Sequence, residues 1–243
     1  MMISGPRDIG KTALILNVLR NLPDQLAGNC LYIAGFKDLQ DLLRNVLKSL
    51  YRVGNPALRR QLRTERVSAA NFEVWLRSLS VTRLKGTLYR AIEGSDYRVI
   101  LDQTPPLTHA IAKVVKELFW MRETPVCLLV RDGPEDRVDQ FSHFFYWGRR
   151  ERLALGPLPR PVAAGMLEWC IGQFGLAGFD SREFRHEVLE LSDCVPGAIT
   201  KMCAMALDKR YQHGSRIKTK LVHIDYMMAG QDFGFSAAKR TPR

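Results

Sequence analysis

The sequence lacks any pair of cysteines at the spacing Cys-x-x-Cys. Its five cysteines are scattered and odd in number, and most of them lie in apolar surroundings. They are Cys30, Cys127, Cys170, Cys194 and Cys203. Zinc sites and disulfide frameworks need cysteines at characteristic paired spacings, so the sequence predicts neither. This use of cysteine is typical of a protein in a reducing compartment, and we expect the cytoplasm.

Long apolar runs and a secretory signal peptide are also missing. No stretch of the 243 residues is apolar enough, for long enough, to cross a bilayer. We therefore expect no membrane association.

Acidic residues are scarce relative to basic ones. The chain has 36 Lys and Arg against 25 Asp and Glu, which gives a formal net charge of +11. Such a field attracts phosphate-rich partners, nucleic acid above all, although excess basic charge also serves solubility alone. With 46% hydrophobic residues, the sequence has the composition of an ordinary globular protein, and its length suits one α/β domain with a small appendage.

A loop near the start of the chain carries the most specific pattern. Gly5-Pro6-Arg7-Asp8-Ile9-Gly10-Lys11-Thr12 fits Gly-x-x-x-x-Gly-Lys-[Ser/Thr] at every fixed position and lies between a predicted strand and a predicted helix. Its glycines allow the backbone N–H groups of the loop to turn inward around an anion. The N–H groups of the helix start, as far as Ala13, are expected to contribute as well. Lys11 would reach the β- and γ-phosphates of a nucleotide, and Thr12 would bind Mg²⁺. The alternative is a chance glycine turn before a surface helix.

A second candidate site residue ends an apolar strand at residues 97–102. In phosphate-loop enzymes the carboxylate at this strand end holds Mg²⁺ through water, so Asp102 is the expected partner of Thr12. Apolar runs at residues 1–4, 29–35, 124–131 and 152–156 predict further strands, separated by helical patterns. The alternation predicts an α/β fold with a five-stranded parallel sheet between helices.

The chain is expected to change character at Gly156-Pro157-Leu158-Pro159, which is rich in residues that end elements. We expect an α/β nucleotide-binding domain over residues 1–157. Helices at 161–174, 181–192, 196–211 and 221–229 predict a small all-helical domain over 158–230. The basic tail at 231–243 is expected to be disordered.

Two basic runs interrupt this pattern. Residues 44–63 hold Arg44, Lys48, Arg52, Arg59, Arg60 and Arg63 without an acid, and residues 209–220 hold five more basic side chains. Each run is either a solvated face or a surface for non-specific contact with DNA. The sequence contains no helix-turn-helix or zinc-finger pattern, so we expect no reading of base sequence.

The phosphate loop, the strand ending in Asp102, the further strands and the helical appendage together resemble the AAA+ class of phosphate-loop ATPases. The nearest resemblance is to bacterial AAA ATPases associated with transposition and secretion, with the signal-transducing STAND ATPases close by. Ser192-Asp193-Cys194-Val195-Pro196-Gly197-Ala198-Ile199 is similar to the Gly-x-Pro-Arg-x-Ile motif of the helical lid. The resemblance implies ATP and Mg²⁺ as cofactors.

The same resemblance implies roles for arginines near strand ends. Arg131, at the end of the fourth strand, either senses the γ-phosphate or pairs with Asp132 or Asp136. Arg149 and Arg150 precede the fifth strand, where oligomeric ATPases place an arginine that completes a neighbour's site. An ATP-dependent homo-oligomer would follow.

Three departures weaken the expectation of rapid hydrolysis. Gln103 stands where many relatives have a glutamate that polarises water, and Gly197 stands where the lid motif has arginine. A neutral amide orients water but cannot take its proton. His109 is either a substitute base or a surface histidine. The segment ahead of the loop is short, so either the start of the chain lies further upstream or other parts hold the base.

The sequence thus predicts an ATP-binding protein that acts as a slow nucleotide-dependent switch on a partner, with DNA transactions such as transposition as one setting. The alternatives are a non-hydrolysing nucleotide-binding adaptor or a STAND-type signalling protein. A DNA-binding module with a vestigial ATP site is the third hypothesis.

Overall fold

The structure is a computed structural model of the whole chain and describes residues 1–105, 108–121, 124–131, 152–179 and 181–230. The chain forms two compact units. The first comprises residues 1–7 and 11–155, and the second comprises residues 8–10 and 156–243. Each unit is described by itself.

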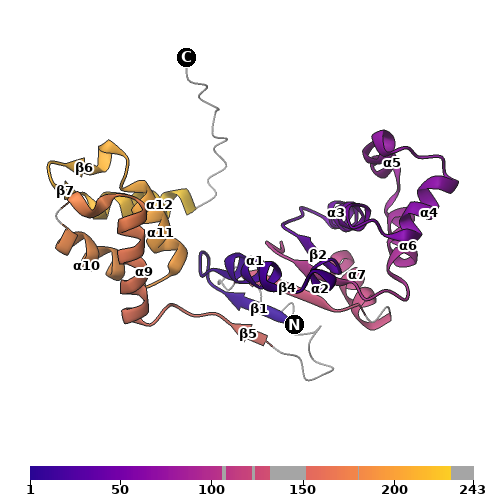
Figure 1. Cartoon of the computed structure of the whole chain (residues 1–243), viewed down its shortest axis with the longest axis horizontal. Helices are drawn as coiled ribbons and strands as arrows, with labels where there is room; N and C mark the ends of the chain where they lie inside the picture. The colour runs from indigo at the N-terminus through magenta and orange to yellow at the C-terminus, as the bar shows by residue number, and fades with distance from the viewer. Residues whose placement is uncertain (106–107, 122–123, 132–151, 180, 231–243) are drawn as a thin grey trace, which may run out of the picture. The chain divides into compact units, whose positions relative to one another are not determined.

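The first unit is built on a parallel sheet of five strands (Figure 1). The strands are β1 (Met2–Gly5), β2 (Cys30–Ile33), β3 (Arg98–Leu101), β4 (Val126–Arg131) and β5 (Arg152–Ala154), in the spatial order β2-β3-β4-β1-β5. The α/β fold with a five-stranded parallel sheet flanked by helices, predicted from the apolar runs, is confirmed. Strand β4 lies between β1 and β3, so these two strands share no backbone ladder.

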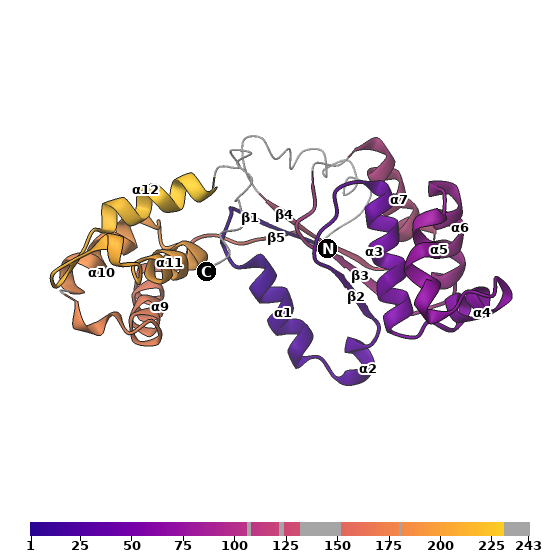
Figure 2. The same cartoon turned by 90° about the horizontal axis from the view of Figure 1, so that it is seen from above.

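Helices cover both faces of this sheet (Figure 2). Helix α1 (Lys11–Asn21) packs with Ile15 against one face, where Ile3, Ile100 and Leu129 are buried. The other face buries the alternate strand residues, among them Leu31 and Leu101. Successive strand side chains point to opposite faces, so apolar strand residues on both sides find helices to cover them.

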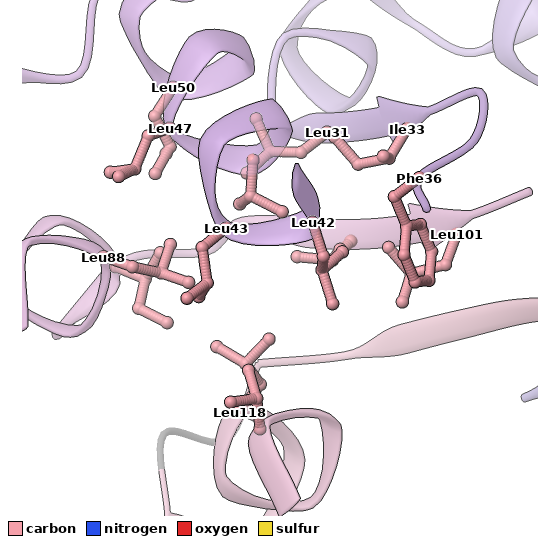
Figure 3. Packing of buried hydrophobic residues seen from close by; sticks show 14 of the residues in the cluster. Leu31, Ile33, Phe36, Leu42, Leu43, Leu47, Leu50, Leu88, Leu101 and Leu118 are labelled. Atoms are coloured by element: carbon pink, nitrogen blue, oxygen red, sulfur yellow. The ribbon is translucent and has the colours of Figure 1, made fainter. Parts of the chain in front are cut away.

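The larger core lies on the face opposite α1 (Figure 3). Helix α3 (Leu39–Arg52) buries five residues along one stripe at helical spacing. They are Leu42, Leu43, Val46, Leu47 and Leu50. Helix α6 (Val81–Ile92) adds Leu88 and helix α7 (His109–Met121) adds Leu118 to the same cluster.

Four helices connect β2 to β3 and form what we call the helical insertion, α3–α6. Between α3 and α6 lie α4 (Pro56–Thr64) and α5 (Phe72–Ser78). The side chain of Asn55 caps α4 by accepting a hydrogen bond from the Leu58 N–H at 2.8 Å, and Pro56 occupies the first helical position. Asn55 is only 2% exposed and also donates to the Ala91 carbonyl at 2.8 Å, which fixes α4 against α6.

Some element bounds differ from those predicted. A short helix α2 (Asp24–Ala27) follows α1. Helix α7 begins at His109, directly after Thr108, whose hydroxyl accepts a hydrogen bond from the Ile111 N–H at 3.3 Å. Within the part of the chain that the structure describes, no helix combines the length and the apolar character needed to span a membrane.

The second unit contains four helices in the described ranges, α9 (Arg160–Gln173), α10 (Ser181–Leu191), α11 (Pro196–Met205) and α12 (Thr219–Gly230). Helix α11 ends six residues before the predicted bound of 211. A short antiparallel pair, β6 (Gln212–His213) and β7 (Arg216–Ile217), follows it.

The prediction of an all-helical second domain was therefore wrong. The chain turns at Gly214, which has φ 58°, a value that glycine adopts without strain. Tyr211, fully buried, donates its hydroxyl to Asp225 at 2.7 Å and holds the chain before the turn against α12. The aromatic segment at 138–150 and the tail at 231–243 lie outside the described residues.

Candidate functional site

The predicted phosphate loop joins β1 to α1, as the motif requires (Figure 1). Gly10 has φ 97°, a left-handed conformation that a side chain would strain, and Asp8 also has a positive φ of 60°. Ile9 is buried at 5% exposure, whereas Arg7 is half-buried and Ala13 is exposed in the first helical turn. No acidic residue lies in that turn, so the positive end of the α1 dipole is not neutralised there.

The Lys11 ammonium lies over the loop itself. Its Nζ donates to the carbonyl oxygens of Gly5 and Pro6 at 2.7 and 2.8 Å. These bonds keep the positive charge at the mouth of the loop, close to the backbone that would surround a phosphate.

Thr12 and Asp102 are brought together, as the sequence predicts. The Thr12 hydroxyl donates to Asp102 Oδ2 at 2.6 Å, although the two residues are 90 positions apart. Asp102 is 2% exposed and directly follows β3. Because the Thr12 hydroxyl donates a hydrogen bond to the carboxylate, the lone pairs of its oxygen remain available to a cation.

Sequence reasoning missed Tyr32, which completes the surroundings of this carboxylate. Its hydroxyl donates to the same oxygen, Asp102 Oδ2, at 2.7 Å. Burial raises the pKa of the Tyr32 phenol far above its ordinary value, and the hydrogen bond to Asp102 raises it further. The hydroxyl therefore stays a donor at neutral pH.

The register of β2 against β3 accounts for the contact between Tyr32 and Asp102. Tyr32 pairs in register with Ile100, and Asp102 lies two residues further along the chain from Ile100, on the same face. The Tyr32 hydroxyl, near the end of β2, therefore lies diagonally across from the carboxylate of Asp102, which follows β3. The partner strand is not evident from the sequence alone.

Gln103, like Asp8, has a positive φ. Its φ is 47°, and its N–H donates to Asp102 Oδ1 at 2.7 Å. Thus each oxygen of the buried carboxylate has a hydrogen-bond donor. The side chain is exposed and lies close to Gly35, where an added Cβ would be 3.7 Å from Gln103 Oε1.

The remaining candidates are less closely placed. Arg131 ends β4, where it pairs in register with Gly5, and its side chain is exposed. His109 is exposed at the first residue of α7, and no contact with Asp102 is seen for it. Asp132, Asp136, Arg149 and Arg150 lie outside the described residues.

The site fits a cation that is shared with phosphates. No group of three or more His, Cys, Asp or Glu side chains able to hold a metal occurs within the described ranges. Mg²⁺ is commonly held by one or two carboxylates together with substrate phosphates and water, and Thr12 with Asp102 matches that pattern.

Comparison with known proteins gives no identification: no protein-family model matches the sequence, and no curated protein matches it significantly.

Proposed function

We propose that the chain is an ATP-binding protein of the AAA+ or STAND-like phosphate-loop type, which acts as a slow nucleotide-dependent switch on a partner. The observation that carries the proposal is the Thr12–Asp102 hydrogen bond of 2.6 Å beside the loop. A chance glycine turn gives no reason for a buried carboxylate to meet the threonine that follows the lysine.

In the proposed function each residue of the site has a separate role. The loop from Gly5 to Gly10 surrounds the phosphates with its N–H groups, and Lys11 supplies positive charge to the β- and γ-phosphates. Thr12 and Asp102 would hold Mg²⁺, which would neutralise charge on the phosphate oxygens. Tyr32 keeps Asp102 in the orientation that meets Thr12.

Hydrolysis is slow in this proposal because Gln103 carries no base. Its exposed amide orients a water molecule without accepting the proton. His109, on the exposed first turn of α7, has no bond to the carboxylate and is not assigned the role.

The second candidate is a non-hydrolysing nucleotide-binding adaptor or signalling protein. The same Gln103 favours it. In that case the bound nucleotide would serve assembly, and Arg149 and Arg150 would act between copies of the chain.

Nucleotide affinity and steady-state ATP turnover of the wild type and Lys11→Ala test both candidates. We expect Lys11→Ala to weaken ATP binding by about tenfold or more, because a charge-assisted contact to phosphate is lost. Lys116→Ala, a lysine exposed on α7, is the matched control and should bind as the wild type does.

The outcomes separate the two candidates. Turnover in the wild type that Lys11→Ala abolishes supports the switch ATPase. Binding without turnover supports the adaptor. Equal ATP affinity in the wild type and Lys11→Ala would contradict both, and size-exclusion chromatography with and without ATP tests the homo-oligomer.

A further inference from the structure

Five of the six basic residues in the run at 44–63 are of two kinds in the structure, and the sixth, Arg60, is exposed but does not line the hollow at the junction of α3 and α4. Lys48 pairs with Glu73 at 2.9 Å, and Arg44 donates to the Arg77 carbonyl at 2.9 Å. Arg52, Arg59 and Arg63, by contrast, are exposed, and none of them forms an ion pair with any residue that the structure describes. We call these three residues the arginine surface.

The arginine surface surrounds a hollow at the junction of α3 and α4. The hollow has a volume of about 480 Å³, and its lining contains no carboxylate. The lining residues are Tyr51, Arg52, Arg59, Leu62, Arg63 and Val67. Arg59 and Arg63 are four residues apart on α4, so they stand on one helix face, about 6 Å apart along the axis.

The scaffold beneath these arginines is fixed. Asn55 ties the start of α4 to α6 through its bond to the Ala91 carbonyl. The Arg59 guanidinium folds over Gly54, where an added Cβ would lie 2.8 Å from its Nη2 atom. Gly54 therefore leaves room for the guanidinium, and its own φ of 75° also requires glycine.

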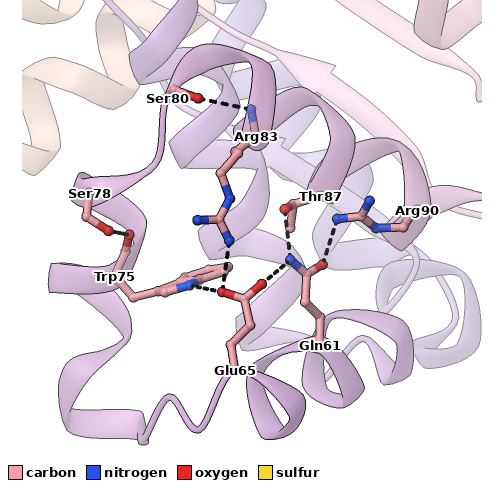
Figure 4. Close-up of polar contacts among 8 residues, drawn as sticks. All are labelled: Gln61, Glu65, Trp75, Ser78, Ser80, Arg83, Thr87 and Arg90. Atoms are coloured by element: carbon pink, nitrogen blue, oxygen red, sulfur yellow. Dashed lines mark hydrogen bonds and ion pairs between the residues drawn. The ribbon is translucent and has the colours of Figure 1, made fainter.

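The nearest carboxylate in sequence is already engaged with other groups (Figure 4). Glu65 accepts from Gln61 at 2.9 Å and Trp75 at 2.7 Å, and pairs with Arg83 at 3.2 Å. The hydrogen bond from Gln61 lowers the pKa of Glu65. Burial opposes this shift, and the contacts with Trp75 and Arg83 add to it. The carboxylate of Glu65 thus forms its ion pair with Arg83 and not with a residue of the arginine surface.

We propose that the arginine surface binds the phosphodiester backbone of a nucleic acid. Guanidinium groups match phosphate oxygens in a planar, two-pronged geometry, and three of them in an acid-free hollow form a site for a polyanion. The net charge of +11 draws such a partner to the chain.

The hollow favours contact with phosphates rather than with bases. Tyr51 stacks on Phe72, with ring centroids 4.0 Å apart and planes 13° apart, so one face of its ring is covered. The surface therefore binds without sequence preference. This inference specifies the partner class of the proposed function, but it requires no nucleotide in the loop.

A salt titration of DNA binding by the full chain tests the inference. A fluorescently labelled duplex is titrated by anisotropy at several salt concentrations, with the wild type and the triple variant R52Q, R59Q and R63Q. The slope of log affinity against log salt should become shallower by about 2.7, since each lost phosphate contact removes about 0.9.

The matched control removes the same charge from the other basic run. In K209Q, R216Q and K218Q three exposed basic residues of the second unit are neutralised. The two paired residues of that run are left in place: Arg210 lies 3.4 Å from Asp225, and Lys220 lies 3.9 Å from Glu187. The control should change the slope by less than half as much, and both triple variants should keep the melting temperature and ATP affinity of the wild type.

Three results would overturn the inference: no binding of the wild type to the duplex at low salt, equal losses in the two triple variants, or binding of polyglutamate in place of DNA. The last result would assign the surface to an acidic protein. ATP affinity, measured on the same samples, keeps these outcomes separate from failure of the nucleotide site.

Discussion

Tyr32 and Asp102, on neighbouring parallel strands, are joined by a hydrogen bond of 2.7 Å to the carboxylate oxygen that also accepts from Thr12. Two hydroxyl groups from different elements thus converge on one buried atom. This arrangement fixes the orientation of the carboxylate, and in the proposed function it would reduce the rearrangement that cation binding requires.

Tyr32→Phe removes one of these donors and keeps the ring. We expect the affinity for ATP with Mg²⁺ to fall about fivefold, the equivalent of about 1 kcal/mol, because the carboxylate is no longer held toward Thr12. The affinity for ATP in the presence of a chelator should not change. Calorimetric titration with and without Mg²⁺ measures both.

Tyr89→Phe is the control for this substitution, because Tyr89 also donates to a carboxylate, that of Glu117, on helices away from the loop. It should leave both affinities unchanged. If Tyr32→Phe weakened binding equally with and without Mg²⁺, Tyr32 would act on the loop as a whole and not through Asp102.

Gln103→Glu places a base where the sequence has an amide. If the exposed side chain lies beside the attacking water, steady-state ATP turnover should rise by about tenfold or more, since general-base catalysis contributes at least that much. ATP affinity should stay within about twofold, because the bond from the residue 103 N–H to Asp102 does not depend on the side chain.

Gln103→Ala distinguishes a gain of base from a loss of amide. An equal rise in turnover for both variants would show that the amide obstructs the site, and no rise in either would contradict the proposal that Gln103 limits turnover.

Asn55→Ala tests the junction of the helical insertion. The substitution removes the cap of α4 and leaves the buried Ala91 carbonyl without its donor, so the free energy of unfolding should fall by about 2–3 kcal/mol. Chemical denaturation with urea measures this loss. Asn71→Ala, at an exposed position whose side chain forms no capping bond, should cost less than about 0.5 kcal/mol.

Much of the first unit could be predicted because its signals are local. Each buried strand is a short apolar run, and Lys11 and Thr12 belong to a contiguous motif. Asp102 could be predicted because it ends such a run. To predict the contact between Asp102 and Thr12, one must also know that the strands before these two residues end at the same edge of the sheet.

The features that were missed depend on contacts between distant segments. Tyr32 acquires its role only from the register of β2 against β3, and periodicity within one strand does not contain that register. The strands β6 and β7 are two residues each, too short to alternate, and the hydrogen bond from the buried Tyr211 to Asp225 joins the segment before them to α12. A hydrogen bond between two side chains, such as that from Tyr211 to Asp225, leaves no periodic pattern in the sequence.

The position of the helical insertion gives the Tyr32–Asp102 pair a structural consequence. The insertion leaves the sheet after β2, which contains Tyr32, and returns to it at β3, which Asp102 follows. Tyr32, in the strand before the insertion, therefore donates to the same oxygen of Asp102, the residue that follows the strand after it, as Thr12 does. This one carboxylate oxygen thus links the strand before the insertion, the residue after it and the first turn of α1.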